Sequence, residues 1–437
     1  MRIIILLSIV LSFLHPSVIH IPEQFPLIQQ GINASVTGDT ILVQPGTYYE
    51  NINISGHDIT LASLFITTGD TSYISQTVID GNQNDRVILI ANSGDQTPKL
   101  IGFKVTNGYV TNNDGGGILI HNASPVLRSL IVSSNEARRT SGTVKGGGIA
   151  CRDGSNPTIT EVLVADNYAG PYSSKGGGIS ITDNSAPVLI NVKVVNNSIT
   201  MSSAGHGSGI YIENSSPMIN GIEVSTNEGG VGAGIYVTQN SSLLLSNFHI
   251  SDNSALSTDG CGIHLGGESF LQMQHGEISG NLMSHNMSKG AGIFVYENSV
   301  ADLFDVSIHN NTINIEAPVQ IDGAGIYCRS SQLNCEKVSI YNNQLITLRG
   351  GGNGAGLAVF NNSQIFLSDV EVIHNQVVIT EEEGVGNGVW MHIVGSYCEI
   401  DRSVFSENEV ISDLAINEGL AVNITNSSLL LKNSTLV

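Results

Sequence analysis

One short phrase, Gly-x-Gly followed by an aliphatic residue, returns about every thirty residues along most of the chain. Ten copies begin at Gly115, Gly146, Gly176, Gly207, Gly232, Gly260, Gly290, Gly323, Gly354 and Gly386, and a degraded copy begins at Asn417. A fixed period of this length is typical of solenoids, in which each repeat is one coil that buries its apolar face only by stacking on its neighbours. The chain is therefore expected to form one elongated domain rather than several globular ones.

The repeats have the alternation of a strand rather than the spacing of a helix. The residue after the second glycine and the residue two places later are apolar in each copy, as in Ile210 and Ile212. Side chains two residues apart lie on one face of a strand, so both columns are expected to point into the core. The same alignment assigns these two columns to Val389 and Met391 in the tenth copy and to Leu420 and Val422 in the last.

A second apolar segment in each repeat ends in asparagine. These asparagines are Asn135, Asn167, Asn197, Asn227, Asn253, Asn281, Asn311 and Asn343. Asparagine tolerates the left-handed backbone of a tight bend, and its amide can bond the asparagine of the next coil. This column of equivalent asparagines predicts an asparagine ladder in the wall of a parallel β-solenoid, with strands about 4.8 Å apart.

The first 114 residues precede the regular repeats. A charged start and a short apolar stretch predict a signal peptide over 1–20, and nothing later is apolar for long enough to form a transmembrane helix. Apolar residues at 25, 28, 32 and 36 predict a helix that caps the open end of the solenoid. We expect one domain over 21–437, with a cap and irregular coils over 21–114 and repeats over 115–437. Because the sequence stops at Val437 inside a coil, the array is expected to be incomplete there.

The amino-acid composition narrows the class of possible binding partners. The chain has 17 Lys and Arg against 38 Asp and Glu, a net charge of −21, yet only 13% of its residues are charged. An acidic surface of mostly uncharged polar residues argues against a nucleic-acid partner. The five cysteines are odd in number and widely spread; Cys328 and Cys335 are the one local pair, and the others are interpreted as core side chains.

Three motifs together carry a family resemblance. GDTILVQPGTYYE at 38–50, TVIDG at 77–81 and the GGGI coils resemble the bacterial right-handed parallel β-helix proteins of the pectin-lyase-like superfamily. The resemblance implies an all-β, right-handed parallel β-helix and an extracellular or bacterial cell-surface location. The pairing of GGGI with aliphatic-x-x-Asn is also similar to the repeats of polymorphic outer-membrane autotransporter adhesins, although this chain mostly has Ile or Val where they have Phe.

The superfamily includes polygalacturonases, which carry NTD, paired Asp, GHG and RIK motifs, and pectate lyases, which hold calcium with acidic residues. Gly205-His206-Gly207 spells GHG, but none of the companion motifs is present, so His206 is interpreted as a loop histidine and no catalytic residue is assigned.

Asp153 and Asp183 hold the same repeat position on adjacent coils, near Lys145, Arg152 and Lys175. Two carboxylates about 4.8 Å apart repel each other, and a shared calcium ion would hold both. The alternative is that Asp favours this turn and that the lysines neutralise it. The sequence leaves both interpretations open.

Between the two inward columns lies a third column, which strand alternation sends outward. It holds rings on several successive coils, at Tyr211, Tyr236, His264, Phe294 and Tyr327, and the only Trp follows at Trp390. Rings in register would form a flat strip suited to stacking on sugars or on a partner's strand. Such rings can also stabilise the sheet by stacking on one another, and the column fits either role.

Three classes of function remain. The prediction is an exported surface protein that binds glycan or protein through the aromatic strip, without catalysis. The alternatives are a lyase or hydrolase of an acidic polysaccharide, with calcium as its cofactor, and a passive stalk.

Overall fold

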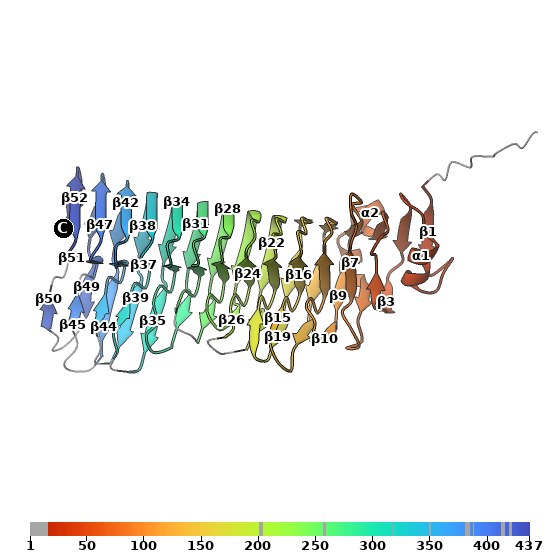
Figure 1. Cartoon of the computed structure of the whole chain (residues 1–437), viewed down its shortest axis with the longest axis horizontal. Coiled ribbons are helices and arrows are strands. Elements are labelled where there is room, and N and C mark those ends of the chain that lie inside the picture. The colour runs from red at the N-terminus through yellow and green to blue at the C-terminus, as the bar shows by residue number, and fades with distance from the viewer. Residues whose placement is uncertain are drawn as a thin grey trace, which may run out of the picture.

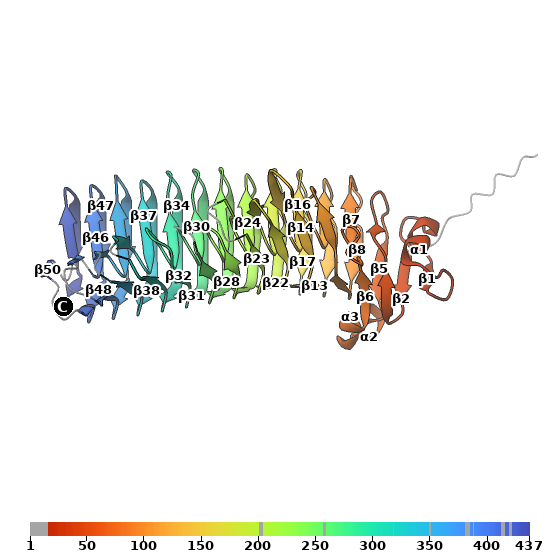
Figure 2. The same ribbon diagram turned by 90° about the horizontal axis from the view of Figure 1, so that it is seen from below.

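The computed structural model describes residues 16–437 except 201–203, 257–258, 318, 349–350, 381–384, 388, 412–415 and 419–421. These residues form an elongated rod of stacked coils that runs from helix α1 (Ile28–Ala34) to strand β52 (Ser428–Lys432) (Figure 1). The same stacking is seen when the rod is turned by 90° (Figure 2). The strands pair in parallel, so the predicted parallel β-solenoid is confirmed.

Each regular coil contributes to three sheets in turn. The first sheet has 13 strands, namely β4 (Ile52–Asn53), β7 (Ile88–Ala91), β11 (Ile118–His121), β16 (Ile149–Arg152), β21 (Ile179–Thr182), β24 (Ile210–Glu213), β27 (Ile235–Thr238), β30 (Ile263–Leu265), β33 (Ile293–Val295), β37 (Ile326–Arg329), β41 (Leu357–Phe360), β46 (Met391–Val394) and β51 (Val422–Thr425). The third sheet has 11 short strands, from β10 (Tyr109–Thr111) to β49 (Glu409–Ile411).

The second sheet has 23 strands among the described residues. Its longer strands are β22 (Val188–Val195), β25 (Met218–Ser225), β28 (Ser242–Ser251), β31 (Phe270–Ser279), β34 (Val300–His309), β38 (Gln332–Tyr341), β42 (Gln364–Ser368), β47 (Tyr397–Asp401) and β52. In most coils the chain then passes through the third sheet and a loop before the next repeat glycine. Two of these loops pair as β15 (Thr143–Lys145) and β20 (Ser173–Lys175).

The two apolar columns of the first sheet fill the core as predicted. Ile210 lies opposite Ile179 and Ile235 in register, and all three are fully buried. The five cysteines are also buried and free, Cys328 and Cys335 included. Burial raises the pKa of the Cys151, Cys261, Cys328 and Cys398 thiols to about 12.

The asparagine file forms the predicted ladder at the bend between the second and third sheets. From Asn135 to Asn375, each side-chain amide donates to the Oδ1 atom of the next asparagine at 2.9–3.1 Å. A second file runs through the turn between the first and second sheets, where the backbone N–H of Ser185 donates to Ser215 Oγ at 3.2 Å. The repeat pattern does not by itself predict this column of serines. Both files satisfy backbone groups that would otherwise be buried without partners.

The predicted cap is present at the N-terminal end. Helix α1 covers the end of the core with Ile28 and Ile32, which are fully buried. The Glu50 carboxylate accepts the Ile28 and Gln29 backbone N–H groups at 2.8 and 2.9 Å and so caps the helix. Two short helices, α2 (Phe65–Thr68) and α3 (Ser72–Gln76), add to this end of the rod.

The structure describes the N-terminal segment only from residue 16, so most of the predicted signal peptide lies outside the described residues. Strand β1 (Val18–Ile21) pairs in register with β2 (Thr40–Val43), so the first coil begins before the boundary expected at residue 21. None of the helices described in the structure is long and apolar enough to cross a membrane.

The register of the last two copies differs from the sequence alignment by two residues. Met391 pairs with Leu357 and Val422 pairs with Met391, so Met391 and Val422 occupy the first inward column, not the second. Trp390 lies one residue before β46 and packs its ring into the core, where it is 7% exposed. The expectation that Trp390 points outward is therefore wrong. The register that buries Met391 and Ile393 overrides the glycine spacing.

Candidate functional site

The ring column stacks along the rod as predicted. Tyr211 and Tyr236 have centroids 5.5 Å apart, Tyr236 and His264 4.3 Å, His264 and Phe294 4.9 Å, and Phe294 and Tyr327 5.2 Å. Tyr211 is 1% exposed, Phe294 5% and Tyr327 2%. Tyr236 is half-buried, and the expectation of an exposed strip is wrong for the other four rings, whose contacts are those of rings that stabilise the sheet by stacking.

Loops that enter the first sheet cover these rings. Gly232, Gly260 and Gly290 each lie against the ring residue of their own strand, so the chain turns over the outer face of the sheet there. Lys175 Nζ is 4.7 Å from the Tyr211 ring centroid, and the His206 ring meets the Tyr236 ring edge-on at 4.7 Å. Strand alternation predicted correctly that the rings leave the core, but it says nothing of a loop packed outside them.

His206 and His264 are enclosed in this layer, and neither Nδ1 atom has a hydrogen-bond partner. Burial lowers the pKa of His206 to about 4 and that of His264 to about 3. Burial likewise raises the pKa of the Tyr211, Tyr236 and Tyr327 hydroxyls. The ring column is therefore uncharged near neutral pH.

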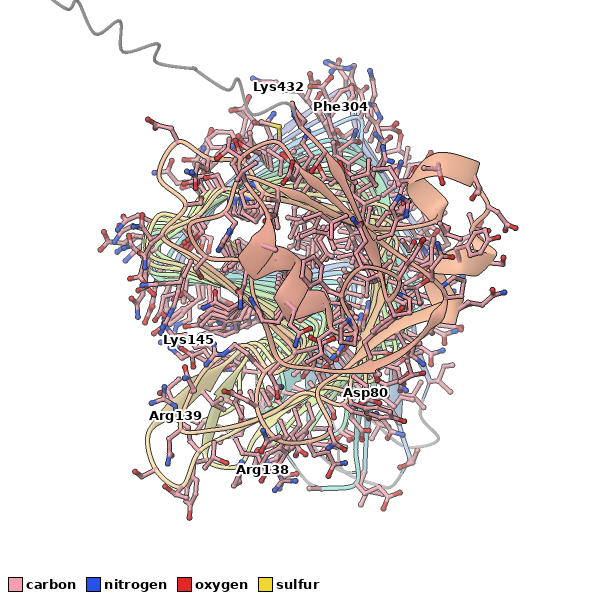
Figure 3. The ribbon with its side chains drawn as sticks, turned by 90° about the vertical axis from the view of Figure 1, so that its right-hand side faces the viewer. Asp80, Arg138, Arg139, Lys145, Phe304 and Lys432 are labelled. Atoms are coloured by element: carbon pink, nitrogen blue, oxygen red, sulfur yellow. The ribbon has the colours of Figure 1, made fainter. Side chains whose placement is uncertain are left out.

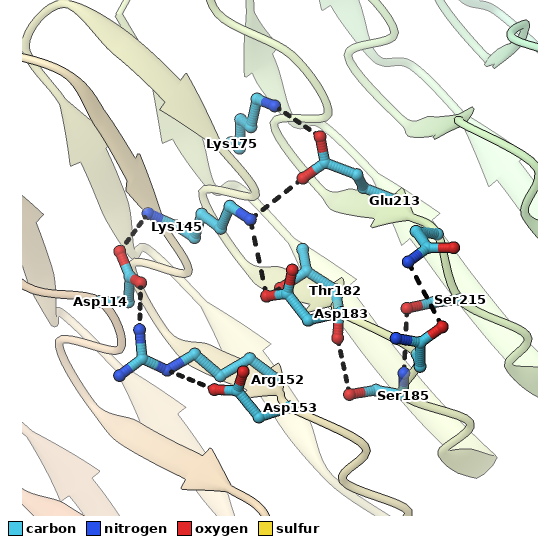
Figure 4. Close-up of polar contacts among 12 residues, drawn as sticks. Asp114, Lys145, Arg152, Asp153, Lys175, Thr182, Asp183, Ser185, Glu213 and Ser215 are labelled. Carbon is cyan, nitrogen blue, oxygen red and sulfur yellow. Dashed lines mark hydrogen bonds and ion pairs between the residues drawn. The ribbon is translucent and has the colours of Figure 1, made fainter.

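A network of ion pairs lies over the N-terminal end of the ring column (Figure 4). Lys145 Nζ and Lys175 Nζ each donate to one oxygen of Glu213 at 3.0 Å. Burial would raise the pKa of Glu213, but the hydrogen bonds and charges of the two lysines outweigh it and hold this pKa below its usual value. A neighbouring carboxylate, Asp114, binds Arg152 at 3.1 Å and Arg139 at 3.5 Å.

The two candidate calcium ligands lie at the edge of this network, each with its own cationic or imidazole partner. Asp153 Oδ2 is 2.5 Å from His121 Nδ1 and 3.5 Å from Arg152 Nε, and Asp183 Oδ2 is 3.8 Å from Lys145 Nζ. Over the described residues, no group of three or more His, Cys, Asp or Glu side chains is placed to hold a metal ion. The geometry resembles the alternative in which neighbouring cations neutralise the aspartates.

An open site, which we call the hollow, lies on the outer face of the second sheet across β31, β34, β38, β42 and β47. It has a volume of about 570 Å³ and is lined by Gln272, Met273, Asp302, Leu303, Phe304, Asn334, Cys335, Glu336, Phe366, Leu367, Ser368, Glu399 and Asp401. Figure 3 looks along the rod and shows Phe304 and Lys432 on one side of the molecule, away from Lys145 and Arg139.

Two half-buried rings and a set of polar side chains face into the hollow. Phe304 is opposite Glu336 on β38, and Phe366 is opposite Asn334 on the same strand. The two rings therefore lie two coils apart along the rod and two residues apart along the strand direction. The Asn334 amide donates to Asp302 Oδ1 at 2.5 Å. Lys337 Nζ lies 4.8 Å from the Phe304 ring centroid, at the margin of the site.

The hollow could not be predicted from the repeat pattern, because residue types along its lining positions differ from coil to coil. Along the file that contains Phe366, successive coils carry Leu244, Gln272, Asp302, Asn334, Phe366 and Glu399. An alignment of the repeats shows no shared residue type at this position. The strand register was needed to place the two phenylalanines near each other.

Comparison with known proteins identifies the fold. Residues 34–217 and 201–345 match the family described as right handed beta helix region. The curated proteins gave no match. Among solved structures, the periplasmic alginate epimerase AlgG is 12% identical with a TM-score of 0.40, over 94% of this chain and 83% of that one. A double mutant of AlgG is 11% identical with a TM-score of 0.39, over 90% and 77%.

Proposed function

Because the chain belongs to the right-handed β-helix family, whose rigid coils present long outer faces, we propose that it is a non-catalytic binding protein that holds an extended glycan in the hollow. The observation that carries this role is the joint presence of Phe304, Phe366 and several carboxylate and amide groups in one open depression. We place the binding surface on the second sheet instead of the ring column, because loops cover most of the rings in that column.

The chemistry of the lining suits a sugar. Sugar rings have apolar faces that stack on aromatic rings, while their hydroxyl groups donate to carboxylate and amide oxygens. Phe304 and Phe366 supply the first kind of contact, and Asn334 and Ser368 add polar partners. The hollow crosses five strands, a span of roughly 19 Å at 4.8 Å per strand. That length accommodates several sugar units in a row.

The location that fits this role is the cell exterior or a bacterial cell surface. The apolar start of the chain supports export, and the acidic, largely uncharged polar composition suits a soluble surface. The similarity of the repeats to those of autotransporter adhesins stays a prediction.

The test is to screen the full chain on a glycan array, and to measure the strongest ligand by calorimetry with Phe366→Ser and with Phe304→Ser. Each substitution is expected to weaken binding by at least roughly tenfold while leaving the unfolding midpoint nearly unchanged. Phe270→Ser is the matched control, because Phe270 is also half-buried on the outer face of β31 but does not line the hollow. Binding that survives both hollow substitutions would remove the hollow as the site.

A second candidate is chemistry on an acidic polysaccharide at the ion-pair network. The observation that favours it is the gathering of Lys145, Lys175, Arg152 and Glu213 in one network over the first sheet. Cations of this kind can neutralise a uronate carboxylate, and a lysine can act as a base. Incubation with uronate polymers, with and without a calcium chelator, is expected to yield unsaturated products if this role is correct. Absence of products under both conditions would exclude it.

A further inference from the structure

The charge of the hollow selects among glycans. The described residues that line it include four carboxylates, of Asp302, Glu336, Glu399 and Asp401, and no Lys or Arg. Given the binding role proposed above, on which this step rests, we propose that the ligand carries protonated amino groups, as in a polymer of amino sugars with free amines.

Two of the four carboxylates are largely neutralised where they stand. Lys432 Nζ binds Glu399 at 2.5 Å, and Arg402 pairs with Asp401. Both cations belong to the C-terminal coils. Because these two carboxylates already form ion pairs within the protein, they contribute to the shape and hydrogen bonding of the hollow more than to its net charge.

The other two carboxylates, of Asp302 and Glu336, lie on either side of the Phe304 position in the strand register, and neither makes a short ion pair among the described residues. Asp302 accepts a hydrogen bond from the Asn334 amide at 2.5 Å. Glu336 has Lys337 at 4.0 Å, with both side chains more than half exposed, an arrangement that contributes little attraction. Glu336 stands directly opposite Phe304 in the parallel register. A sugar stacked on Phe304 would therefore place a substituent of its ring near Glu336 on one side and near Asp302 on the other.

The same charges disfavour acidic polymers. A uronate stacked on Phe304 would bring its carboxylate toward Asp302 and Glu336, on a chain whose net charge is −21. Like charges brought together in a partly enclosed site reduce affinity and provide selectivity against the wrong ligand. An ammonium group at the same position is attracted by both carboxylates and would displace Lys337, whose Nζ atom lies 4.8 Å from the Phe304 ring centroid.

The experiment compares four hexasaccharides with the same backbone linkage on the full chain: β-1,4-linked glucosamine, N-acetylglucosamine, glucose and a uronate. The glucosamine hexamer is expected to bind roughly tenfold more tightly than the acetylated and glucose hexamers at low salt. This preference is expected to shrink in high salt, because screening weakens the contribution of charge. The uronate hexamer is expected to bind most weakly.

Glu336→Gln is expected to remove most of the preference for the amine, measured as the ratio of the dissociation constants of the glucosamine and glucose hexamers. Glu371→Gln, at an exposed carboxylate on the same sheet outside the hollow, is the matched control and is expected to change nothing. If all the uncharged hexamers bind as tightly as the amine and Phe366→Ser weakens them, the glycan role stands and the amine preference is wrong. If none of the four binds, both are wrong. Equal binding of a lysine hexapeptide, insensitive to Phe366→Ser, would also overturn the preference, because it would show a surface for cations in general.

Discussion

The Phe294 and Tyr327 rings lie nearly parallel, with planes 3° apart and centroids 5.2 Å apart. Together with Ala358 they form a small apolar cluster of their own outside the main core, against which Tyr296 and Phe360 pack. The first sheet is therefore covered by one apolar layer on each face, namely the core on one face and the stacked rings on the other. The rod is stabilised by contacts between successive coils in both layers.

Phe294→Ala is expected to lower the free energy of unfolding by about 3–4 kcal/mol, because it leaves a gap between His264 and Tyr327 in a buried stack. Phe304→Ala, at a half-buried ring on the open face, is expected to cost about 1 kcal/mol or less. Urea unfolding followed by circular dichroism measures both. Similar losses for the two variants would contradict the assignment of one ring to a buried layer and the other to an open site.

Asn281→Ala is expected to cost about 2–3 kcal/mol. The Asn281 amide donates to the Ile250 and Ser279 carbonyl oxygens and to Asn311 Oδ1, so its removal leaves buried acceptors without partners. Asn314→Ala, at an exposed position of β35 (Thr312–Ile315), is the control and is expected to change stability by less than about 0.5 kcal/mol. The same unfolding measurement distinguishes them, and a neutral Asn281→Ala would show that the ladder does not stabilise the rod.

Stability is expected to fall as the pH drops from about 6.5 to about 4, because of the enclosed histidines. Burial lowers the pKa of His264 to about 3 and of His206 and His392 to about 4. The unfolded chain binds protons on these histidines in that interval and the folded chain does not, so acid favours unfolding by up to about 1.4 kcal/mol per pH unit for each histidine.

His264→Phe is expected to make the unfolding midpoint less dependent on pH between 6.5 and 4, since phenylalanine keeps the stack with Tyr236 and Phe294 and cannot be protonated. His285→Gln, at an exposed histidine, is the control and is expected to leave the pH dependence as it is. Urea midpoints at several pH values check both. An unchanged slope in His264→Phe would mean that His264 is accessible to protons in the folded state.

Glu213→Gln is expected to destabilise the loops over the first sheet by roughly 1–3 kcal/mol, because Lys145 and Lys175 would lose the carboxylate that both bind. Lys145→Met in the Glu213→Gln background is expected to recover part of this loss by removing one of the two lysine charges that Glu213 neutralises. Hydrogen exchange of residues 143–145 and 173–175 reports on the loops directly. Unaltered exchange in Glu213→Gln would show that the network does not hold them in place.

The repeat pattern predicted the coil, the core columns and the asparagine ladder because each depends on neighbours at a fixed distance in sequence. Ile210 is buried because Ile179 and Ile235 recur one repeat away on each side, and Asn197 is bonded because Asn167 and Asn227 do the same. The register of Trp390 was missed because the glycine spacing and the burial of Met391 and Ile393 disagree there, and burial dominates.

By itself, the sequence determined that the chain winds into stacked parallel coils, with a helix over one end and aromatic rings outside the core. The tertiary structure alone decided which outer face is open. Whether a ring that leaves the core meets solvent depends on the loop packed over it, as with Lys175 over Tyr211, and no periodicity within a strand records that contact. The hollow likewise depends on which dissimilar side chains the register brings side by side across several coils, as with Phe304 and Glu336.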